Sequence, residues 1–263
     1  MTSEAPLDGL GSPERFGFAW DKYSELIPEY ETQFRRWAVH LPPEEWAGKT
    51  FLDVGCGMGR NSFWPIKYGA ASGVGIDIDD RSLASARNTL NGLPVEVRKL
   101  SAYDIDYRDH FDITFSIGVI HHLSNPEIAL SRMVAATKPG GRMLIWVYGL
   151  ENNQWVVTFL DPLRKALFGW MPIKLVFALS IIPTAAIWLL LRLGLRPTEY
   201  FRLIAGFKFW HLRSIVFDQM LPKIAGYWPR SHVEKLMGDA GLNEVKLAWV
   251  NENSWSAIGT KPL

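Results

Sequence analysis

Three alternating glycines follow an apolar segment early in the chain, in a pattern that suits the binding of a nucleotide. The run is Phe51-Leu52-Asp53-Val54-Gly55-Cys56-Gly57-Met58-Gly59. Glycine adopts positive φ at little steric cost and has no Cβ, so such a turn lets the backbone approach a ligand closely. A second apolar run ends at Asp77, 22 residues after Gly55. An acid at that place is typical of the carboxylate that binds ribose hydroxyls in α/β proteins.

The spacing of the glycines separates two kinds of nucleotide site. A dinucleotide fingerprint, G-x-G-x-x-G, would put the third glycine one residue beyond Gly59. The spacing here is G-x-G-x-G, with Asp53 two residues ahead of the first glycine. This pattern resembles the first motif of the class I S-adenosylmethionine-dependent methyltransferases, and it argues against a nicotinamide oxidoreductase.

Later segments resemble the same family in the same order. Asp77 matches the ribose-binding acid, and Ser101-Ala102 lie where the family places residues beside adenine. The run from Phe111 to Leu123 resembles the fourth strand and the loop that faces the methyl group. Lys138-Pro139-Gly140-Gly141 resembles the turn before the fifth strand. Four ordered motifs argue against a chance match.

The resemblance implies S-adenosylmethionine as the cofactor and S-adenosylhomocysteine as the product. Gly55 and Gly57, with Cys56 between them, would border the methionine end, and Asp53 would support its amino group. Asp77 would accept hydrogen bonds from the ribose. Position 101 usually holds an acid in the family, so Asp104 is an alternative partner for the adenine amino group. The cofactor-binding residues implied beyond the glycine loop and Asp77 are Ile78, Ser101, Ala102, Asp104 and Ser116.

Methyl transfer to an oxygen requires a base, and two histidines offer one. His121 and His122 follow the predicted fourth strand, at the edge where ligands bind in open α/β sheets. Neighbouring residues of an extended segment point in opposite directions, so we expect only one of them, His121, to act on the substrate. A hydrogen-bonded structural histidine is the alternative.

Further side chains are candidates for the substrate end of the site. Trp20 and Tyr23 precede the first strand, where an aromatic face could cover the sulfonium, although the rings could equally pack on the sheet. Arg60-Asn61 beside the glycines, His122 and His211 could contact a polar or anionic group. The sequence has no H-x-x-H, H-E-x-x-H or cysteine-pair motif, so no metal site is predicted.

The elements expected to hold these residues alternate between strand and helix. Such alternation predicts a parallel, doubly wound sheet. We expect an α/β, Rossmann-like methyltransferase fold of seven strands, parallel except for an antiparallel last strand, with an N-terminal helical cap and a helical insert. The predicted strands lie near 50–54, 72–77, 95–99, 112–116, 142–148, 245–250 and 255–259, and the helices of the sheet lie near 60–69, 80–91 and 126–136.

The length fits one large domain with additions. We divide the 263 residues into an N-terminal helical cap (1–49), a cofactor-binding core (50–150), an insert (151–228) and a last helix with the strand pair (229–263). A net charge of +1 predicts no general affinity for nucleic acid. A single cysteine suits a reducing, cytoplasmic compartment. Residues 1–6 lack the apolar stretch of a signal peptide, so we expect none.

The insert differs from the rest of the chain in charge and hydrophobicity. Residues 151–230 carry ten Lys or Arg and four acids, a net charge of +6, together with five of the 12 tryptophans. Residues 175–191 contain no charge, and as a helix they would be about 26 Å long, against roughly 30 Å for the core of a bilayer. A spanning segment would also separate the last strands from their sheet, so we do not expect one.

Several roles for the insert remain open. It could lie in a membrane interface or cover an apolar pocket, and it could instead enlarge the core or form a dimer interface. The resemblance implies a methyltransferase, and the insert indicates a small, apolar or amphipathic acceptor, with O-methylation preferred over C- or N-methylation. The alternative is a cofactor-binding scaffold that docks a partner through the insert. We expect a cytoplasmic protein that associates peripherally with a membrane.

Overall fold

A computed structural model describes residues 12–23 and 25–263. Seven strands form one sheet: β1 (Thr50–Val54), β2 (Ser72–Asp77), β3 (Val95–Lys99), β4 (Phe111–Ile117), β5 (Thr137–Tyr148), β6 (Asn243–Val250) and β7 (Ser254–Thr260). The strand order is β3-β2-β1-β4-β5-β7-β6. β7 runs antiparallel to its neighbours β5 and β6, whereas the other neighbouring pairs are parallel. The predicted fold class is confirmed.

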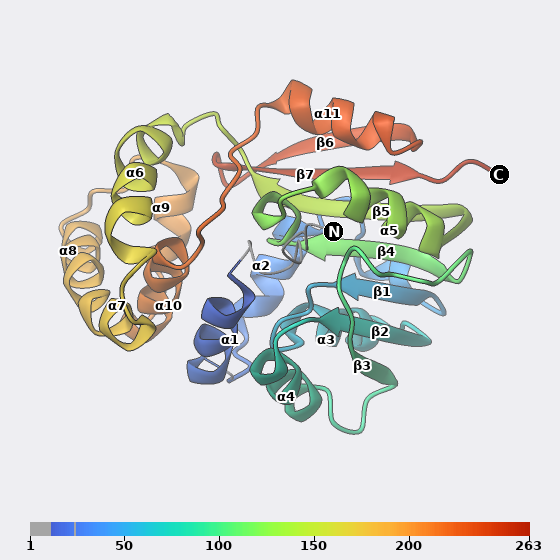
Figure 1. Cartoon of the computed structure of the whole chain (residues 1–263), viewed down its shortest axis with the longest axis horizontal. Coiled ribbons are helices and arrows are strands. Elements are labelled where there is room, and N and C mark those ends of the chain that lie inside the picture. Colours follow the sequence, from blue (N-terminus) through green and yellow to red (C-terminus); the bar gives the residue numbers. More distant parts are fainter. Residues whose placement is uncertain (1–11, 24) are drawn as a thin grey trace, which may run out of the picture.

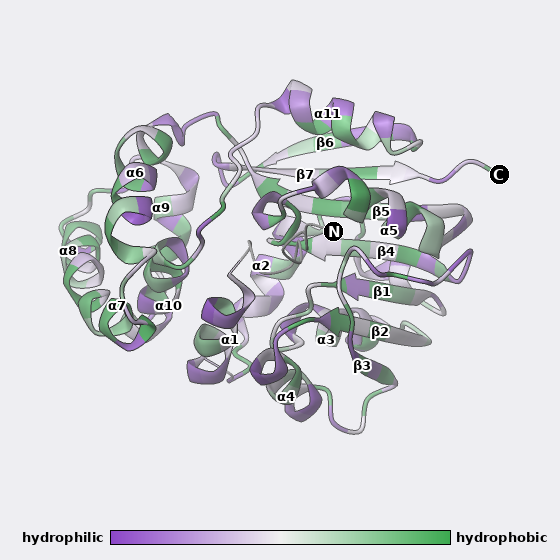
Figure 2. Cartoon of the chain, in the orientation of Figure 1, coloured by the Kyte–Doolittle hydropathy of each residue, from purple (hydrophilic) through white to green (hydrophobic). Residues whose placement is uncertain are grey.

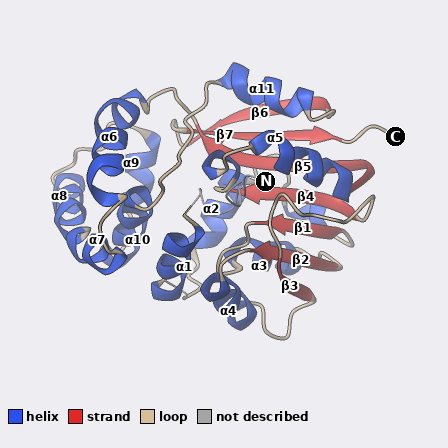
Figure 3. Cartoon of the chain, in the orientation of Figure 1, coloured by secondary structure: helices blue, strands red, loops and turns tan. Residues whose placement is uncertain are grey.

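Helices cover both faces of the sheet (Figure 3). The alternation of side chains along a strand builds a core on each face. Leu52 and Val54 of β1 pack with α5 and α11, whereas Phe51 packs on the other face with α2, η2 and α3. The helices that pack on the sheet are α2 (Glu29–Trp37), the short helix η2 (Pro43–Trp46), α3 (Arg60–Lys67), α4 (Asp80–Thr89), α5 (Pro126–Ala136) and α11 (Arg230–Asp239).

The insert lies beyond the carboxyl ends of the parallel strands. In Figure 1 the arrowheads of β1 and β4 point toward it, while β7 and the C-terminus point away. Open α/β sheets bind ligands at this edge. The elements of the insert are η4 (Val156–Leu160), α6 (Asp161–Leu163), η5 (Arg164–Phe168), α7 (Ile173–Leu179), α8 (Ile181–Arg192), α9 (Glu199–Ile204) and α10 (Phe209–Met220), of which η4 and η5 are π-helical turns.

Helix α1 (Pro13–Lys22) connects the core to the insert, because it packs against both α4 and α10. The buried Arg15 of this helix donates from Nη2 to the Phe168 carbonyl at 2.8 Å and from Nη1 to the Met171 carbonyl at 3.4 Å. A guanidinium carries several donors in a fixed geometry, so one side chain can hold two carbonyls of the insert at once.

The apolar stretch of the insert is divided at Ser180, where α7 ends and α8 begins. The Phe177 carbonyl accepts hydrogen bonds from Ser180 Oγ at 2.7 Å and from Arg213 Nη2 at 2.5 Å. These side chains replace the backbone donor that a continuous helix would supply. Pro183 follows closely and lacks a backbone N–H, which reinforces the break.

Apolar side chains of the insert remain exposed. Among the described residues, 15 of the 18 exposed large hydrophobic side chains belong to it, including Trp170 at 86% and Phe159 at 71% exposure. Apolar residues predominate along α7 and α8 (Figure 2). The segment Ile173–Arg192 is long and apolar enough to cross a membrane, and only 17% of its most apolar window is buried. Because β6 and β7 rejoin the sheet, the chain returns from the insert to the core.

Two local conformations differ from the sequence expectations. β5 begins at Thr137, so residues 138–141 form an irregularity within the strand and not a turn ahead of it. His121 and His122 lie in a short 3₁₀ helix, η3 (Ile120–His122), and not in an extended segment. The expectation of no signal peptide rests on residues 1–6, which lie outside the described residues.

Candidate active site

A cavity of about 840 Å³ lies between the carboxyl edge of the sheet and the insert. The glycine loop forms one wall, and residues of η4 to η5 and of α8 to α10 form another. Its volume suits a cofactor-sized or drug-sized ligand. The sequence-predicted site residues that line it are Trp20, Gly55, Cys56, Gly57, Arg60, Asn61, Asp77, Ile78, Ala102, His122 and His211.

The glycine loop has the backbone that only glycine adopts without strain. Gly55 and Gly57 have φ values of 76° and 54°. A Cβ on Gly55 would lie 2.4 Å from Val119 Cγ2, and one on Gly57 would lie 3.0 Å from Trp20 Nε1. The backbone therefore approaches its neighbours, and the cavity, more closely than any residue with a side chain could.

Asp77 ends β2 and is tied to the glycine loop. Its Oδ2 accepts a hydrogen bond from Gly57 N at 3.0 Å, and its Oδ1 accepts from Ile78 N at 2.8 Å and from Asp79 N at 3.1 Å. Burial raises the pKa of Asp77, and these three backbone donors oppose the rise. The carboxylate is thus fixed at the edge of the cavity by groups that the fold supplies.

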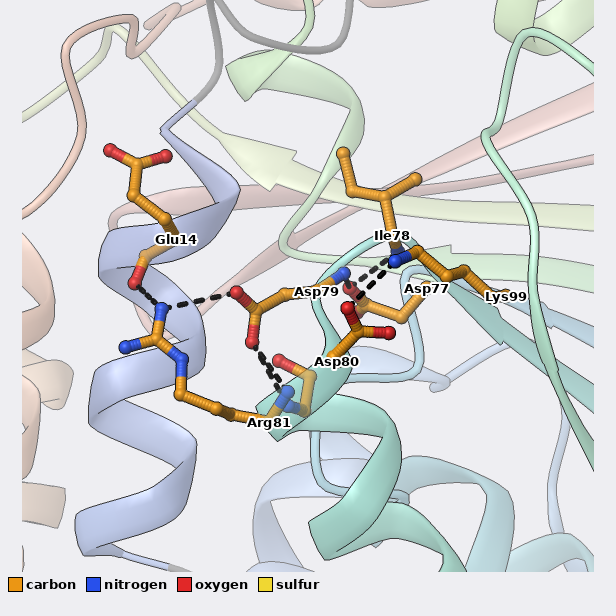
Figure 4. A network of polar contacts seen from close by, with 8 residues as sticks. Glu14, Asp77, Ile78, Asp79, Asp80, Arg81 and Lys99 are labelled. Atoms are coloured by element: carbon orange, nitrogen blue, oxygen red, sulfur yellow. Dashed lines mark hydrogen bonds and ion pairs between the residues drawn. The ribbon is translucent and has the colours of Figure 1, made fainter.

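Next to Asp77, a polar network joins α4 to α1 (Figure 4). Asp79 caps α4 by accepting from the backbone N–H groups of Arg81 and Ser82. The Arg81 guanidinium pairs with Asp79 Oδ2 at 3.1 Å and donates to the Glu14 carbonyl of α1. α1 passes so close that a Cβ on Gly17 would overlap the Asp79 carboxylate. α1 also lines the cavity through Phe16 and Trp20, and we call the side formed by the glycine loop, Asp77 and α1 the cofactor wall.

Asp53 and Ser116 lie behind the loop, outside the cavity lining that the described residues form. Asp53 Oδ2 accepts from Ser62 Oγ at 2.6 Å, and burial raises its pKa to about 7. Ser116 Oγ donates to the Val54 carbonyl at 2.8 Å. Burial, with Asp77 and Asp53 nearby, raises the pKa of the Cys56 thiol well above its usual value. The thiol is therefore protonated at neutral pH.

Of the four residues expected around adenine, two line the cavity and two do not. Ile78 and Ala102 line the cavity from the ends of β2 and of the segment after β3. Ser101 is buried, and its Oγ accepts from Tyr103 N at 3.1 Å. Asp104 is exposed and, like Ser101, does not line the cavity among the described residues. The adjacent Leu100 lines it instead.

The two histidines have different surroundings. His121 is 1% exposed, both its ring nitrogens lack a partner among the described residues, and burial lowers its pKa well below the usual value. His122 lines the cavity, and its Nδ1 lies 2.7 Å from the Ile224 carbonyl. Burial lowers the pKa of His122 to about 4. Because a carbonyl can only accept, Nδ1 of His122 carries the proton, and Nε2 of the neutral ring is an acceptor.

Arg60, at the start of α3, is held among aromatic rings. Its guanidinium lies 4.8 Å from the ring centre of Trp20, 4.7 Å from Tyr30 and 5.3 Å from Trp37. Such contacts position a cation by attraction to the ring faces. Among the described residues, Arg60 forms no ion pair within 4.0 Å. Its neighbour Asn61 is buried at the cavity wall.

Tyr23 and His211 belong to the junction of the cap and the insert. The Tyr23 ring lies 5.3 Å from that of Trp210 and packs in the cluster with Phe177, outside the cavity lining formed by the described residues. His211 lines the cavity, stacks on Phe207 at 4.1 Å, and has a pKa that burial lowers to about 4. Tyr23 thus contacts the insert, and His211 faces the cavity.

Sequence reasoning missed Asp218 of α10, which also lines the cavity. Its Oδ1 has no hydrogen-bond partner among the described residues, and burial raises its pKa to about 7. Tyr148, Tyr200 and Tyr227 line the same region. The available clue was that Asp218 is the one acid in the largely apolar run Phe209–Met220. Among the described residues, no group of three His, Cys, Asp or Glu could hold a metal ion.

The residues present fit S-adenosylmethionine. The backbone of residues 55–58 borders the cavity without side chains at two positions, and Asp77 lies beside it at the ribose position of an α/β site. Residues 52–145 match the family model described as a methyltransferase domain. These residues form a methyltransferase domain that resembles the class I S-adenosylmethionine-dependent methyltransferases, and its cofactor is S-adenosylmethionine, with S-adenosylhomocysteine as the product.

Individual relatives resemble parts of the chain. A ubiquinone biosynthesis O-methyltransferase from Paramagnetospirillum magneticum is 29% identical over 145 residues, covering 52% of this chain and 57% of the relative. A tRNA U34 carboxymethyltransferase from Shewanella piezotolerans is 30% identical over 180 residues, covering 58% of this chain and 53% of the relative. The chain thus spans about half the length of these curated relatives.

A solved structure resembles almost the whole chain in fold. The S-adenosylmethionine-dependent methyltransferase from Thermotoga maritima matches with a TM-score of 0.52 at 16% identity, covering 94% of this chain and 99% of that one. At this identity the likeness concerns the fold alone.

Proposed function

We propose that this chain transfers a methyl group from S-adenosylmethionine to an oxygen of a small, apolar or amphipathic acceptor. The observation that carries the proposal is the shared cavity, because the glycine loop lines one wall and the insert lines the other. A molecule held against the insert would face the cofactor end directly. The ubiquinone biosynthesis O-methyltransferase among the relatives supports transfer to oxygen.

When bound, S-adenosylmethionine supplies an already activated methyl group, so the protein must chiefly align the acceptor and exclude water. Gly55 and Gly57 let the backbone bind at close range, and Asp77 offers a fixed carboxylate to hydroxyl donors. Trp20 covers the loop from α1. Val156, Leu160 and Leu163 give the insert wall an apolar lining.

The proposal is tested with purified protein, methyl-labelled S-adenosylmethionine and a lipid extract of the source cells. We expect S-adenosylhomocysteine to form and the label to enter the organic phase. Asp77→Ala is the inactive control, because it removes the carboxylate that would bind the ribose hydroxyls of the cofactor. Cofactor binding without any product would contradict the proposal and would favour a scaffold that docks a partner through the insert.

We also propose that the outer face of the insert binds an anionic membrane surface from the cytoplasm. The exposed side chains of Phe159, Trp170, Ile182 and Leu193 offer apolar anchors, and the excess of basic residues in the insert suits anionic headgroups. The acceptor would then reach the cavity from the lipid. A dimer formed through the insert is the competing outcome, which sedimentation of the protein without lipid would reveal.

A small acceptor is favoured over nucleic acid, although one relative is a tRNA U34 carboxymethyltransferase. Apolar residues and tyrosines predominate on the acceptor side of the cavity, where Arg164 is the one lining Lys or Arg among the described residues of the insert. Affinity for nucleic acid depends instead on many phosphate contacts. We expect no label in added tRNA under conditions that label the lipid extract. Label in the tRNA would reverse this choice.

A further inference from the structure

Asp218 presents a carboxylate to the cavity from α10 without a hydrogen bond at its buried Oδ1. It also forms no ion pair within 4.0 Å among the described residues. Burying an unpartnered carboxylate costs free energy, so proteins rarely retain one without a use. Because Oδ1 itself is closed to solvent, a donor group of a ligand in the cavity would reach the carboxylate at Oδ2.

Titratable and charged groups face Asp218 from several elements. Burial is the largest influence and raises its pKa to about 7, while the nearby Arg60 opposes the rise. Burial raises the pKa of four tyrosines around it, and Asp218 adds to that rise. These groups are Arg60 of α3, Tyr23 at the end of α1, Tyr30 of α2, Tyr148 of β5 and Tyr200 of α9.

The facing groups suit a neutral hydroxyl better than a cation. A cationic acceptor bound at Asp218 would be repelled by Arg60, whose charge already acts on that carboxylate. Neutral tyrosines on the other sides neither repel nor attract a hydroxyl group strongly. A carboxylate whose pKa is close to neutral is also a stronger base than an exposed one, yet it still loses its proton under mild conditions.

We propose that Asp218 accepts the proton of the acceptor hydroxyl that becomes methylated. This inference rests on the proposed function, because it assigns a base to that reaction. Asp218 and the glycine loop line one cavity, so an acceptor between them can present its oxygen to the methyl group and its proton to the carboxylate. His122 lines the same cavity but is a weak base, because its pKa lies near 4.

The step balances in atoms and charge. The acceptor oxygen bonds to the methyl carbon while the carbon–sulfur bond breaks and its electron pair stays on sulfur. The hydroxyl proton passes to the Asp218 carboxylate, which becomes a neutral carboxyl. The positive charge on sulfur and the negative charge on Asp218 are thereby both lost, and the products are a methyl ether and a neutral thioether.

The test measures binding of para-nonylphenol and of its methyl ether, para-nonylanisole, to protein saturated with S-adenosylhomocysteine at pH 8.5. The ether has the same apolar body but no proton to donate. For Asp218→Asn we expect the affinity for the phenol to fall about 10- to 100-fold, since a hydrogen bond to a charged acceptor is lost. Affinity for the ether and for S-adenosylhomocysteine should stay unchanged.

Asp239→Asn is the matched control, because it removes the same charge from an exposed side chain of α11 that pairs with Lys235. It should leave binding of both probes unchanged. If Asp218→Asn does not fold, Asp218→Ser removes the same charge and takes its place. Dodecylamine is included as a cationic probe.

Two results would overturn the role of Asp218. One is unchanged phenol affinity in Asp218→Asn, and the other is a larger loss for dodecylamine than for the phenol, which would make the carboxylate a cation site. Failure of the label-transfer experiment would instead overturn the proposed function, so the two failures are distinguishable.

A second readout does not depend on any ligand. Because the pKa of Asp218 is raised to about 7 from an ordinary value near 4, the folded state holds a proton that the unfolded state has lost between these pH values. The wild type therefore loses stability as pH rises through this window, and Asp218→Asn does not share this loss. The melting temperature of the variant relative to wild type should rise from pH 4.5 to pH 8.5. A constant difference would show that Asp218 is ionised throughout and is no poised base.

Discussion

The two walls of the cavity satisfy their polar groups in different ways. At the cofactor wall, the lining carboxylate of Asp77 accepts three backbone hydrogen bonds. At the insert wall, Asp218 Oδ1 has no partner among the described residues, and apolar side chains such as Trp170 face outward. The lining carboxylate of the cofactor wall is thus held by the fold itself, whereas the lining carboxylate of the insert wall accepts no hydrogen bond from the described residues.

The largest expected effect tests the outward face of the insert. Replacing Phe159, Trp170 and Ile182 by serine removes three exposed apolar anchors. At about 1.5 kcal/mol for each anchor, binding to vesicles that contain anionic lipid should weaken about 1,000-fold. Co-sedimentation with vesicles measures this, and Ile128→Ser, an exposed apolar residue of α5, is the matched control. If the triple variant bound vesicles as tightly as the wild type, the exposed apolar side chains of the insert would have no role in membrane binding.

At the cofactor wall, Asp77→Asn should lower the affinity for S-adenosylhomocysteine about 100-fold, because a charged acceptor for two ribose hydroxyls is lost. Isothermal titration calorimetry measures the affinity. Asp80→Asn is the control, since this neighbouring acid is exposed and pairs with Lys99 at 2.7 Å. An unchanged affinity in Asp77→Asn would mean that the ribose lies elsewhere.

A pH experiment tests the burial of His211 in the insert. Its pKa is lowered to about 4 in the folded state, below an ordinary value near 6.5. The unfolded state therefore binds more protons between these values, and stability falls as pH drops through them. His211→Gln should lose about 2 kcal/mol less than wild type between pH 7 and pH 4.5 in urea denaturation. Asp53 and Asp218, with raised pKa values, act in the opposite sense, so only the difference between the two proteins is informative.

The smallest expected effect concerns the aromatic cover of the glycine loop. Trp20→Ala removes the ring beside Gly57 and one of the rings around Arg60. Affinity for S-adenosylhomocysteine should fall about 10-fold. Tyr23→Phe is the control, because its hydroxyl has no partner among the described residues and it does not line the cavity that they form. If the affinity for S-adenosylhomocysteine fell in both variants, the effect would belong to α1 as a whole and not to the Trp20 ring.

The sequence predicted the strands and the glycine turn beside the cavity because their determinants are local. A strand, its glycine turn and the acid after the next strand lie within residues 50–77, and each obeys a rule of short range. The irregular start of β5 escaped prediction, because a Pro-Gly-Gly segment suits a turn equally well. The 3₁₀ turn at His121 and His122 was also not predicted from the sequence. No local pattern distinguishes a 3₁₀ turn from an extended end of a strand.

The insert wall could not be predicted in the same way. Its hydrophobicity and charge were evident, but the orientation of Asp218 depends on how α10 packs against α1 and α8, residues distant in sequence. The sequence likewise placed Tyr23 and Trp20 together as candidates. Packing then put Trp20 over the loop and Tyr23 against Phe177. Tertiary contacts of this kind carry no periodic pattern in the chain.

Helix α1 makes contact with both walls at once. Its Glu14 carbonyl accepts from Arg81 beside Asp77, and its Arg15 holds the carbonyls of Phe168 and Met171 in the insert. A movement of α1 that uncovers the glycine loop would break or drag these insert contacts. Departure of the spent cofactor and departure of the methylated product would then share one gate, and turnover would proceed as a single opening and closing of the enzyme and not as two independent exchanges.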